Sequence, residues 1–205
     1  MMKFAVPSLI AAAAVASTSS ASIIVFTNQF VWNFYANSDS AAQYTETFES
    51  ATVGFQSSLT GAMGGVTWTF NAANGLYVDN VNSSRVVSTN APGDALSLTL
   101  SPGVKGFAGN VYGTDATFNV VPSIVQLSLS DGTSYIGLVD SATAFVGFYS
   151  TTAAITGVTI LAQPLPGGTN DVWPTFDNMT FAVVPAPGAL ALIGLAGLAG
   201  SRRRR

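Results

Sequence analysis

The run Val125-Gln126-Leu127-Ser128-Leu129-Ser130-Asp131-Gly132, continued by residues 133–139, decides the fold of this chain. Its apolar residues alternate with small polar ones, which places Val125, Leu127 and Leu129 on one face of a strand. The Asp-Gly pair favours the tight turn that joins two antiparallel strands. The sequence therefore predicts a β-hairpin whose inner face is buried and whose outer face carries small polar side chains.

The same alternation recurs along the chain. Val66, Trp68 and Phe70 alternate with threonine, and three leucines over residues 96–100 alternate with serine and threonine. Apolar stretches bounded by turn residues predict further strands over residues 75–78, 104–111, 144–149, 155–161 and 175–184. About nine short strands, each with one apolar face, are typical of two packed sheets. We therefore predict an all-β chain folded as a single β-sandwich.

Residues 27–35 fit two periods. As a strand, the stretch places Phe30, Trp32 and Phe34 on one face. As a helix, it begins at an N-cap, Thr27, and pairs Phe30 with Phe34 one turn apart. The helix explains more residues, because it accounts for both the hydroxyl cap and the spacing of the aromatic pair. We therefore predict a short N-terminal helix, with its aromatic side chains in the core rather than on a sugar-stacking surface.

The first residues predict export. Lys3 precedes an apolar run over residues 4–16, and Ser19-Ser20-Ala21 offers the small residues that a signal peptidase reads. We expect residues 1–21 to be a signal peptide and the mature chain to begin near Ser22. Exported proteins often form disulfides, but this chain has no cysteine, so it relies on a packed core.

The last residues form a second export element in three parts. Pro185 and Pro187 interrupt any helix and favour an extended segment. Residues 189–200 would form an apolar helix about 18 Å long, shorter than the roughly 30 Å core of a bilayer. The chain then ends in four arginines, Arg202, Arg203, Arg204 and Arg205. Because such charges cross a membrane poorly, the tail predicts a precursor whose short transmembrane helix stalls with the arginines on the cytoplasmic side.

This tail resembles the PEP-CTERM sorting signal of Gram-negative bacteria. The resemblance covers residues 184–205 and lies in the order of proline hinge, short apolar helix and arginine end. The hinge reads Pro185-Ala186-Pro187-Gly188, so alanine stands where the motif Pro-Glu-Pro has glutamate. The resemblance implies processing by a membrane-bound exosortase in addition to signal peptidase, with transient membrane association. It also implies a final place at the cell surface or in the exopolysaccharide matrix of a biofilm.

Residues 22–184 remain between the two signals as one predicted domain. Arg85 and Lys105 are its only cations, against ten carboxylates, so the domain carries a net charge of −8. Such a surface repels nucleic acid and anionic lipid but tolerates divalent cations and neutral sugars. We therefore predict no nucleic-acid partner.

The domain also resembles the β-rich bodies that precede such tails in other bacterial surface proteins. The resemblance lies in Phe26-Thr27 leading to Thr47-Phe48-Glu49, and in residues 107–112, 145–150 and 174–181. Those bodies are jelly rolls similar in outline to carbohydrate-binding modules. The resemblance therefore implies that the predicted sandwich is jelly-roll-like.

Jelly rolls of that kind hold calcium between a carboxylate on an early strand and another on the last strand. Glu49 and Asp177 stand in those places, so the resemblance implies that they would be the calcium ligands. Hard carboxylate oxygens and a negative domain suit this ion. No cofactor is otherwise required by the sequence.

Catalysis is limited by what the chain lacks. With no histidine and no cysteine, the chain has neither Ser-His-Asp nor Cys-His nucleophiles, nor zinc sites built from those ligands. Glycoside hydrolysis needs only two carboxylates. However, the only glutamates are Glu46 and Glu49, and Asp94, Asp115 and Asp131 stand in turns, where a carboxylate bonds the local backbone. We predict no catalytic residues and no enzyme.

Three functions from different classes follow. We favour a structural or interaction protein of the cell surface or extracellular matrix. The alternative is a carbohydrate-binding module for exopolysaccharide, which needs exposed aromatic rings. The candidates for that contact are Trp173, Tyr112, Tyr135 and Tyr149, with Trp173 the first to be tested. The third function is a secreted carboxylate glycosidase, which would release sugar from matrix polysaccharide.

Overall fold

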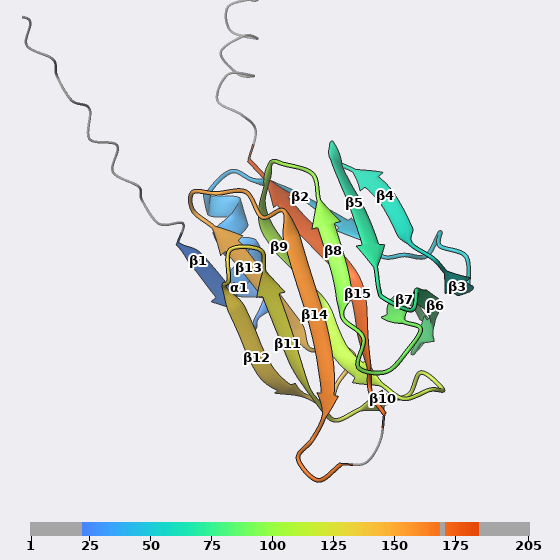
Figure 1. Cartoon of the computed structure of the whole chain (residues 1–205). Helices are drawn as coiled ribbons and strands as arrows, with labels where there is room; N and C mark the ends of the chain where they lie inside the picture. Colours follow the sequence, from blue (N-terminus) through green and yellow to red (C-terminus); the bar gives the residue numbers. More distant parts are fainter. Residues whose placement is uncertain (1–21, 169–170, 185–205) are drawn as a thin grey trace, which may run out of the picture.

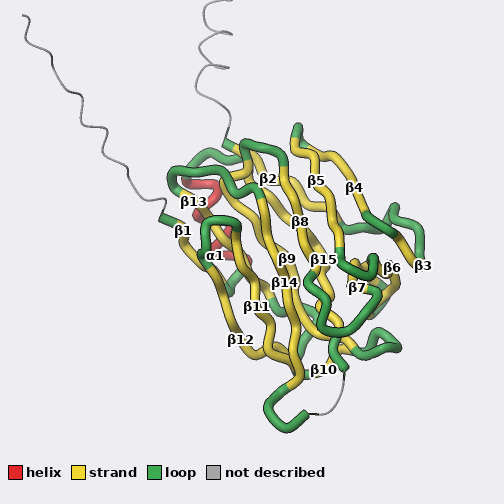
Figure 2. The backbone as a smooth tube through the Cα atoms, viewed as in Figure 1, coloured by secondary structure: helices red, strands yellow, loops and turns green. Residues whose placement is uncertain are grey.

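The computed structural model describes residues 22–168 and 171–184, and its strands form two antiparallel sheets packed face to face (Figure 1, Figure 2). The first sheet follows the order β1 (Ile23–Phe26), β13 (Phe145–Ser150), β9 (Val104–Thr114), β15 (Trp173–Val183), β7 (Ser84–Thr89), β6 (Leu76–Val81) and β3 (Gly54–Gln56), with β10 (Val120–Val121) on β9 and β2 (Ala42–Glu46) on β15. The second sheet follows the order β12 (Ser134–Val139), β11 (Ser123–Leu129), β14 (Gly157–Pro164), β8 (Leu96–Leu100), β5 (Val66–Asn71) and β4 (Leu59–Met63). Helix α1 (Gln29–Ser38) follows β1.

Strands β9 and β15 form the centre of the nine-stranded sheet. Each has 11 residues, and they pair from Trp173 opposite Thr114 to Val183 opposite Val104. The other edge of β15 is shared between β7 and β2. A bulge separates the two, where Asn178 adopts a φ of 51°, which asparagine tolerates better than most residues. Strands β7 and β2, which are far apart in the sequence, thus pair with successive parts of the same edge of β15.

A chain of aromatic rings crosses the space between the sheets. Phe48 and Trp68 both contact Phe70, with ring centroids 5.8 Å from it. Phe70 in turn lies 5.8 Å from Phe176, which stacks on Phe107 at 5.5 Å. Because Phe70 belongs to the six-stranded sheet and Phe176 to the nine-stranded sheet, these rings join the two layers through the centre of the core.

Helix α1 covers part of the outer face of the nine-stranded sheet. Its Trp32 is fully buried, and the indole Nε1 donates a hydrogen bond to the carbonyl oxygen of Phe148 at 3.0 Å. The sheet leaves room for this ring because it carries glycine there. A Cβ added at Gly106 or Gly147 would lie 2.8 or 2.6 Å from the Trp32 ring. Trp32 therefore docks the helix on a part of the sheet where two strand residues are glycine.

The predicted all-β sandwich is confirmed. The turn predicted at Asp131-Gly132 joins β11 to β12, with Gly132 at a φ of 91° and the Asp131 carboxylate accepting the N–H of Thr133 at 2.9 Å. Strands β5, β6, β8, β9, β13, β14 and β15 coincide in large part with predicted stretches. The structure adds strands that the sequence analysis did not predict, namely β1, β2, β3, β4, β7 and β10.

The helix predicted within residues 27–35 is confirmed, but two of its details were wrong. The N-cap is Asn28 rather than Thr27, and its Oδ1 accepts the N–H of Val31 at 3.1 Å. The prediction that Phe30 and Phe34 belong to the core is also wrong, since their side chains are 79% and 67% exposed. Two residues along a helix correspond to about 200° of rotation, so burying Trp32 turns both phenylalanines toward solvent.

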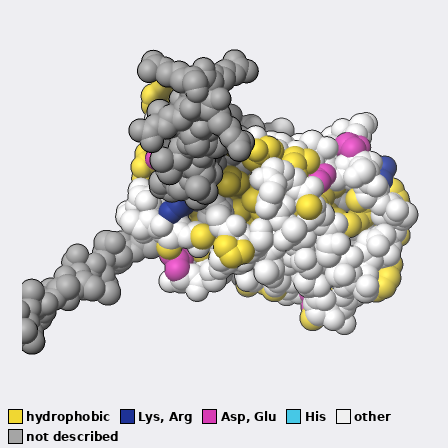
Figure 3. All heavy atoms as spheres, turned by 90° about the horizontal axis from the view of Figure 1, so that it is seen from above, with side chains coloured by type: hydrophobic (Ala, Val, Ile, Leu, Met, Phe, Trp, Pro, Cys, Tyr) yellow, Lys and Arg dark blue, Asp and Glu magenta, His cyan; other side chains and the backbone are white. Residues whose placement is uncertain are grey.

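The described residues contain no helix that is long and apolar enough to span a bilayer. The predicted signal peptide (1–21) and sorting tail (185–205) lie outside the described residues. With them lie the residues predicted for sorting, Pro185, Ala186, Pro187, Gly188, Arg202, Arg203, Arg204 and Arg205. On the described surface in view, Figure 3 shows few charged side chains, as a chain with 8% charged residues leads one to expect.

Candidate functional site

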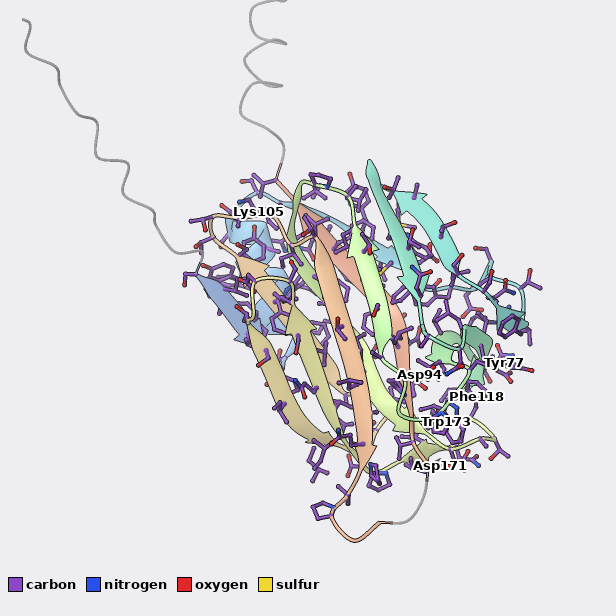
Figure 4. All side chains as sticks on the ribbon, in the orientation of Figure 1. Tyr77, Asp94, Lys105, Phe118, Asp171 and Trp173 are labelled. Carbon is purple, nitrogen blue, oxygen red and sulfur yellow. The ribbon has the colours of Figure 1, made fainter. Side chains whose placement is uncertain are left out.

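A cavity of about 380 Å³, here called the Trp173 cavity, lies at one end of the nine-stranded sheet, where β9 ends and β15 begins. Its lining residues are Tyr77 and Asp79 of β6, Thr89 and Asn90 at the end of β7, Asp115, Ala116, Thr117 and Phe118 after β9, and Trp173 at the start of β15. Figure 4 shows Tyr77, Phe118 and Trp173 gathered at this end of the molecule. The cavity is therefore assembled from four segments that are far apart in the sequence.

Three aromatic side chains give the Trp173 cavity its apolar surface. Tyr77, Phe118 and Trp173 are each half-buried, so part of every side chain remains accessible. The rings of Tyr77 and Phe118 lie 5.8 Å apart, tilted by 38°. Such rings combine a large apolar face with little conformational freedom. The cavity thus offers apolar faces framed by polar side chains.

The loop after β9 is fixed by the Asp115 carboxylate. Its Oδ1 accepts the N–H groups of Thr117 at 2.8 Å and of Asn119 at 2.9 Å, and Asn119 Nδ2 donates to Oδ2 at 3.1 Å. Partial desolvation acts to raise the pKa of Asp115, but the hydrogen bonds from Asn119 and Thr117 outweigh it and lower the pKa to about 2. Phe118, at a φ of 62°, is held inside this turn. The carboxylate therefore orders the loop that presents the Phe118 ring.

Buried hydroxyls tie together the strands beside Trp173. The hydroxyl oxygens of Thr114 and Thr175 lie 2.8 Å apart, and Thr175 donates to Ser88 Oγ at 3.1 Å. Ser88 in turn donates to the carbonyl oxygen of Pro174 at 3.1 Å. These hydroxyls link β9, β15 and β7, and their buried polar atoms are satisfied. Trp173 thus begins a strand whose position is fixed on both sides.

A second cavity, of about 420 Å³, opens beside the loop after β2 and strand β4. Most of its lining side chains are small or polar, among them Glu46, Gln56 and Thr60. Its aromatic residues, Phe48 and Trp68, are buried in the core, so neither offers a ring face to a ligand. The second cavity lacks the aromatic surface of the first.

Of the four aromatic residues predicted to contact glycan, the structure places only Trp173 in the Trp173 cavity. The prediction that Tyr112 and Tyr149 are exposed is wrong, because each is 1% exposed. Tyr112 packs in the core between the sheets, and burial, with the charge of Asp177, raises the pKa of its hydroxyl. Tyr149 lies under α1 and donates to Asp39 Oδ2 at 2.6 Å. Tyr135 lies on the other sheet, half-buried against the core.

Sequence reasoning missed Tyr77, Asp79 and Phe118. The strand predicted over residues 75–78 could have indicated the first two. With Leu76 and Val78 in the core, alternation turns Tyr77 outward, and the next residue on that face is Asp79. Phe118 carries no such signal, because its position depends on a turn with positive φ. The meeting of these residues with Trp173 depends on strand order, which the sequence did not reveal.

The two predicted calcium ligands, Glu49 and Asp177, are both bonded by the start of β7. Ser84 Oγ donates to Asp177 Oδ2 at 2.8 Å, and the N–H of Arg85 donates to Glu49 Oε1 at 2.9 Å. Burial raises the pKa of Asp177, and the charge of Glu49 raises it further against the opposing hydrogen bonds. Within the described ranges, no group of three acidic side chains gathers as a metal site. Because calcium takes about six to eight oxygen ligands, an ion at this pair would need backbone or water oxygens as well.

Calcium binding by Glu49 and Asp177 stays a prediction, which thermal unfolding tests. The expected result is a higher Tm in calcium than in EDTA, because an ion that binds only the folded state stabilises it. At a hundredfold excess over Kd the gain is about 2.7 kcal/mol, or roughly 5–10 °C for a domain of this size. Asp177→Asn keeps the side-chain shape and should remove the response. Equal Tm values in calcium and EDTA would contradict the site.

No family model and no curated protein matches this sequence. Among solved structures, the two-sheet fold is similar to a family 29 carbohydrate-binding module complexed with mannohexaose, with a TM-score of 0.33 and 11% identity over 69% of this chain and 92% of that one. It is also similar to a family 35 carbohydrate-binding module from Clostridium thermocellum (TM-score 0.32, 12% identity, 62% and 98% covered). A third is the CBM22-1 xylan-binding domain of Paenibacillus barcinonensis Xyn10C (TM-score 0.30, 12% identity, 70% and 95% covered). With TM-scores this low, function has to be inferred from the residues of the chain itself.

Proposed function

We propose that the domain is a noncatalytic module that binds polysaccharide in the Trp173 cavity. The observation that carries this proposal is the meeting of Tyr77, Phe118 and Trp173 around one hollow with polar edges. A sugar ring has apolar C–H faces, which pack on aromatic rings, and hydroxyls, which need hydrogen-bond partners. Among the lining residues, Asp79, Thr89 and Asn90 supply such partners. The alternative function of the sequence analysis is therefore better supported than a purely structural one.

Two carboxylates line the cavity, which is also the number that a glycosidase requires. A glycosidase needs a carboxylic acid that is still protonated near neutral pH, which requires a raised pKa. The pKa of Asp115 is instead lowered to about 2, and both of its oxygens accept hydrogen bonds from its own loop. Asp115 is therefore suited to hold the loop and to attract positive charge rather than to donate a proton.

We also propose that the chain reaches its place by export. The leader at residues 1–21 and the tail at residues 185–205 support a path through signal peptidase and exosortase to the cell surface or extracellular matrix. A polysaccharide-binding domain would serve there as a contact between the protein and the matrix. The cell surface would then supply the ligand directly.

Substitution of Trp173 tests the proposed function. Trp173→Ala should lower the affinity of residues 22–184 for a bound polysaccharide by on the order of tenfold, because an aromatic contact contributes about 0.5–1.5 kcal/mol beyond its buried area. Binding is measured by calorimetry with soluble oligosaccharides and by affinity electrophoresis with polymers. Phe34→Ala, which removes an exposed ring from α1, is the matched control and should bind as wild type. Equal binding by Trp173→Ala, or no binding of any glycan by wild type, would refute the proposal.

A further inference from the structure

We infer that the Trp173 cavity selects polysaccharides that contain unacetylated amino sugars, whose amines are positively charged, and disfavours polymers of uronic acids. The inference rests on the proposed function, because it names the class of sugar that the same cavity takes. It follows from the charges around the aromatic rings rather than from the rings themselves.

Two carboxylates belong to the lining of the cavity, Asp79 and Asp115. The low pKa of Asp115 keeps it ionised throughout the pH range in which proteins are used. Its Oδ1 accepts three hydrogen bonds from its own loop, whereas Oδ2 accepts one, from Asn119. For Asp79, the one hydrogen bond found is from the N–H of Asn80 to Oδ1, at 2.7 Å. Each carboxylate therefore keeps an oxygen with capacity for a donor from a ligand.

Two more carboxylates lie at the same end of the molecule without lining the cavity. Figure 4 shows Asp94 and Asp171 at the same end of the molecule as Trp173. Asp94 accepts both the N–H and the side-chain amide of Asn74, each at 3.0 Å. Asp171 precedes Trp173 by two residues. These charges add to the negative potential at this end of the domain and would attract a cationic polymer from a distance.

No lysine or arginine belongs to the lining of the cavity, and the domain's two cations are both engaged elsewhere. The Arg85 side chain donates to Asn80 Oδ1 and to the carbonyl oxygen of Ala51. Because Asn80 and Asp79 are successive strand residues, their side chains point to opposite faces of the sheet. Lys105 donates to the carbonyl oxygen of Thr152, at the other end of β9 (Figure 4). Within the part of the chain that the structure describes, neither cation hydrogen-bonds Asp79 or Asp115.

The aromatic rings favour the same ligands. An ammonium group placed over an aromatic face is attracted by the ring quadrupole, with tryptophan and tyrosine among the best partners. An amino sugar therefore gains from both components of the cavity, its C–H face packing on one ring while its amine approaches a carboxylate. A uronic acid would bring its own carboxylate against those of the cavity, where like charges repel.

The experiment compares three oligosaccharides of equal length on residues 22–184, which hold every described strand and α1. They are a glucosamine oligomer, its fully N-acetylated counterpart and an oligouronate, titrated on the acid side of neutrality, where the amines are protonated. The glucosamine oligomer should bind roughly 1.4- to fivefold more tightly for each carboxylate that it meets, since exposed ion pairs are worth about 0.2–1 kcal/mol. The advantage should shrink as salt is added. The oligouronate should bind most weakly.

Two variants connect the preference to the cavity. Asp79→Asn keeps the size of the side chain and should reduce the advantage of the glucosamine oligomer while leaving the acetylated oligomer unaffected. Asp131→Asn, which removes the same charge from the β11–β12 turn, should leave the advantage intact. Equal affinities for the charged and acetylated oligomers, or tighter binding of the oligouronate, would overturn the inference and leave the proposed function standing. Cationic binding that survives Trp173→Ala would also overturn it, because it would reflect only the charge of the domain. Failure of all three sugars to bind would also overturn the inference, whereas the proposed function would be refuted only if wild type bound no other glycan either.

Discussion

Phe70→Ala is expected to lower the free energy of unfolding of the domain by about 3–5 kcal/mol, the usual cost of deleting a buried phenylalanine ring. Phe70 has no exposed surface and contacts Phe48, Trp68 and Phe176 through its ring. Its removal interrupts the row of rings that joins the two sheets. Neighbouring strands are held by backbone hydrogen bonds on both sides of β5, so they cannot collapse fully into the space left behind.

The effect is measured by urea denaturation of residues 22–184, with Tm as a second readout. For a domain of this size, 1 kcal/mol corresponds to roughly 2–4 °C, so Tm should fall by at least about 6 °C. Phe55→Ala is the matched control, because Phe55 lies on the edge strand β3 and is 58% exposed. If Phe70→Ala lowers the free energy of unfolding by less than about 1 kcal/mol, or if both variants lower it equally, the contacts between these rings do not stabilise the core.

Trp32→Ala should be nearly as costly, although Trp32 lies outside the space between the sheets. The substitution removes a fully buried indole and leaves the carbonyl oxygen of Phe148 without this donor. Gly106 and Gly147, which lie below the ring, have no side chains with which to fill the space. We expect a loss of about 3–5 kcal/mol, with α1 detaching from the sheet.

The Trp32 prediction has its own control on the same helix. Phe34→Ala removes a ring that is mostly exposed and should change stability by less than about 0.5 kcal/mol. Hydrogen exchange should show faster exchange in α1 of Trp32→Ala, while the strands of the six-stranded sheet stay protected. The same slow exchange of α1 in both variants would contradict the docking role of Trp32.

The sequence predicts a strand of this fold where buried apolar residues alternate with outward-facing polar ones. Strands such as β5 and β11 have one buried and one outer face, so their period of two is visible. Strand β7 was missed because its last residues are buried on both faces, including Ser88 and Thr89. The reason that serine is acceptable there is the hydroxyl network with β15, which is a tertiary contact and leaves no local pattern.

The candidate site was predictable only in part for a related reason. Trp173 was the first candidate for glycan contact, and the structure places it in the cavity. Tyr149 was a candidate for the same contact, but α1 covers it. Whether an outward ring meets solvent or another layer depends on how the chain folds back over the sheet. The partners of Trp173 come from β6, which carries Tyr77, and from the loop after β9, which carries Phe118, and these segments meet only in the folded sheet.

Strand β15 runs the length of the domain, from Trp173 at the cavity to Val183 beside the start of β9. Ten steps of about 3.3 Å make this a span of roughly 33 Å. Strand β1 pairs with the end of β13 at the Val183 end, so the described chain both enters and leaves there. If the domain is held at the cell surface through its C-terminal end, the cavity that we propose for polysaccharide lies at the opposite end and faces outward. Under that proposal, several copies attached side by side could hold one long polymer chain at many points at once.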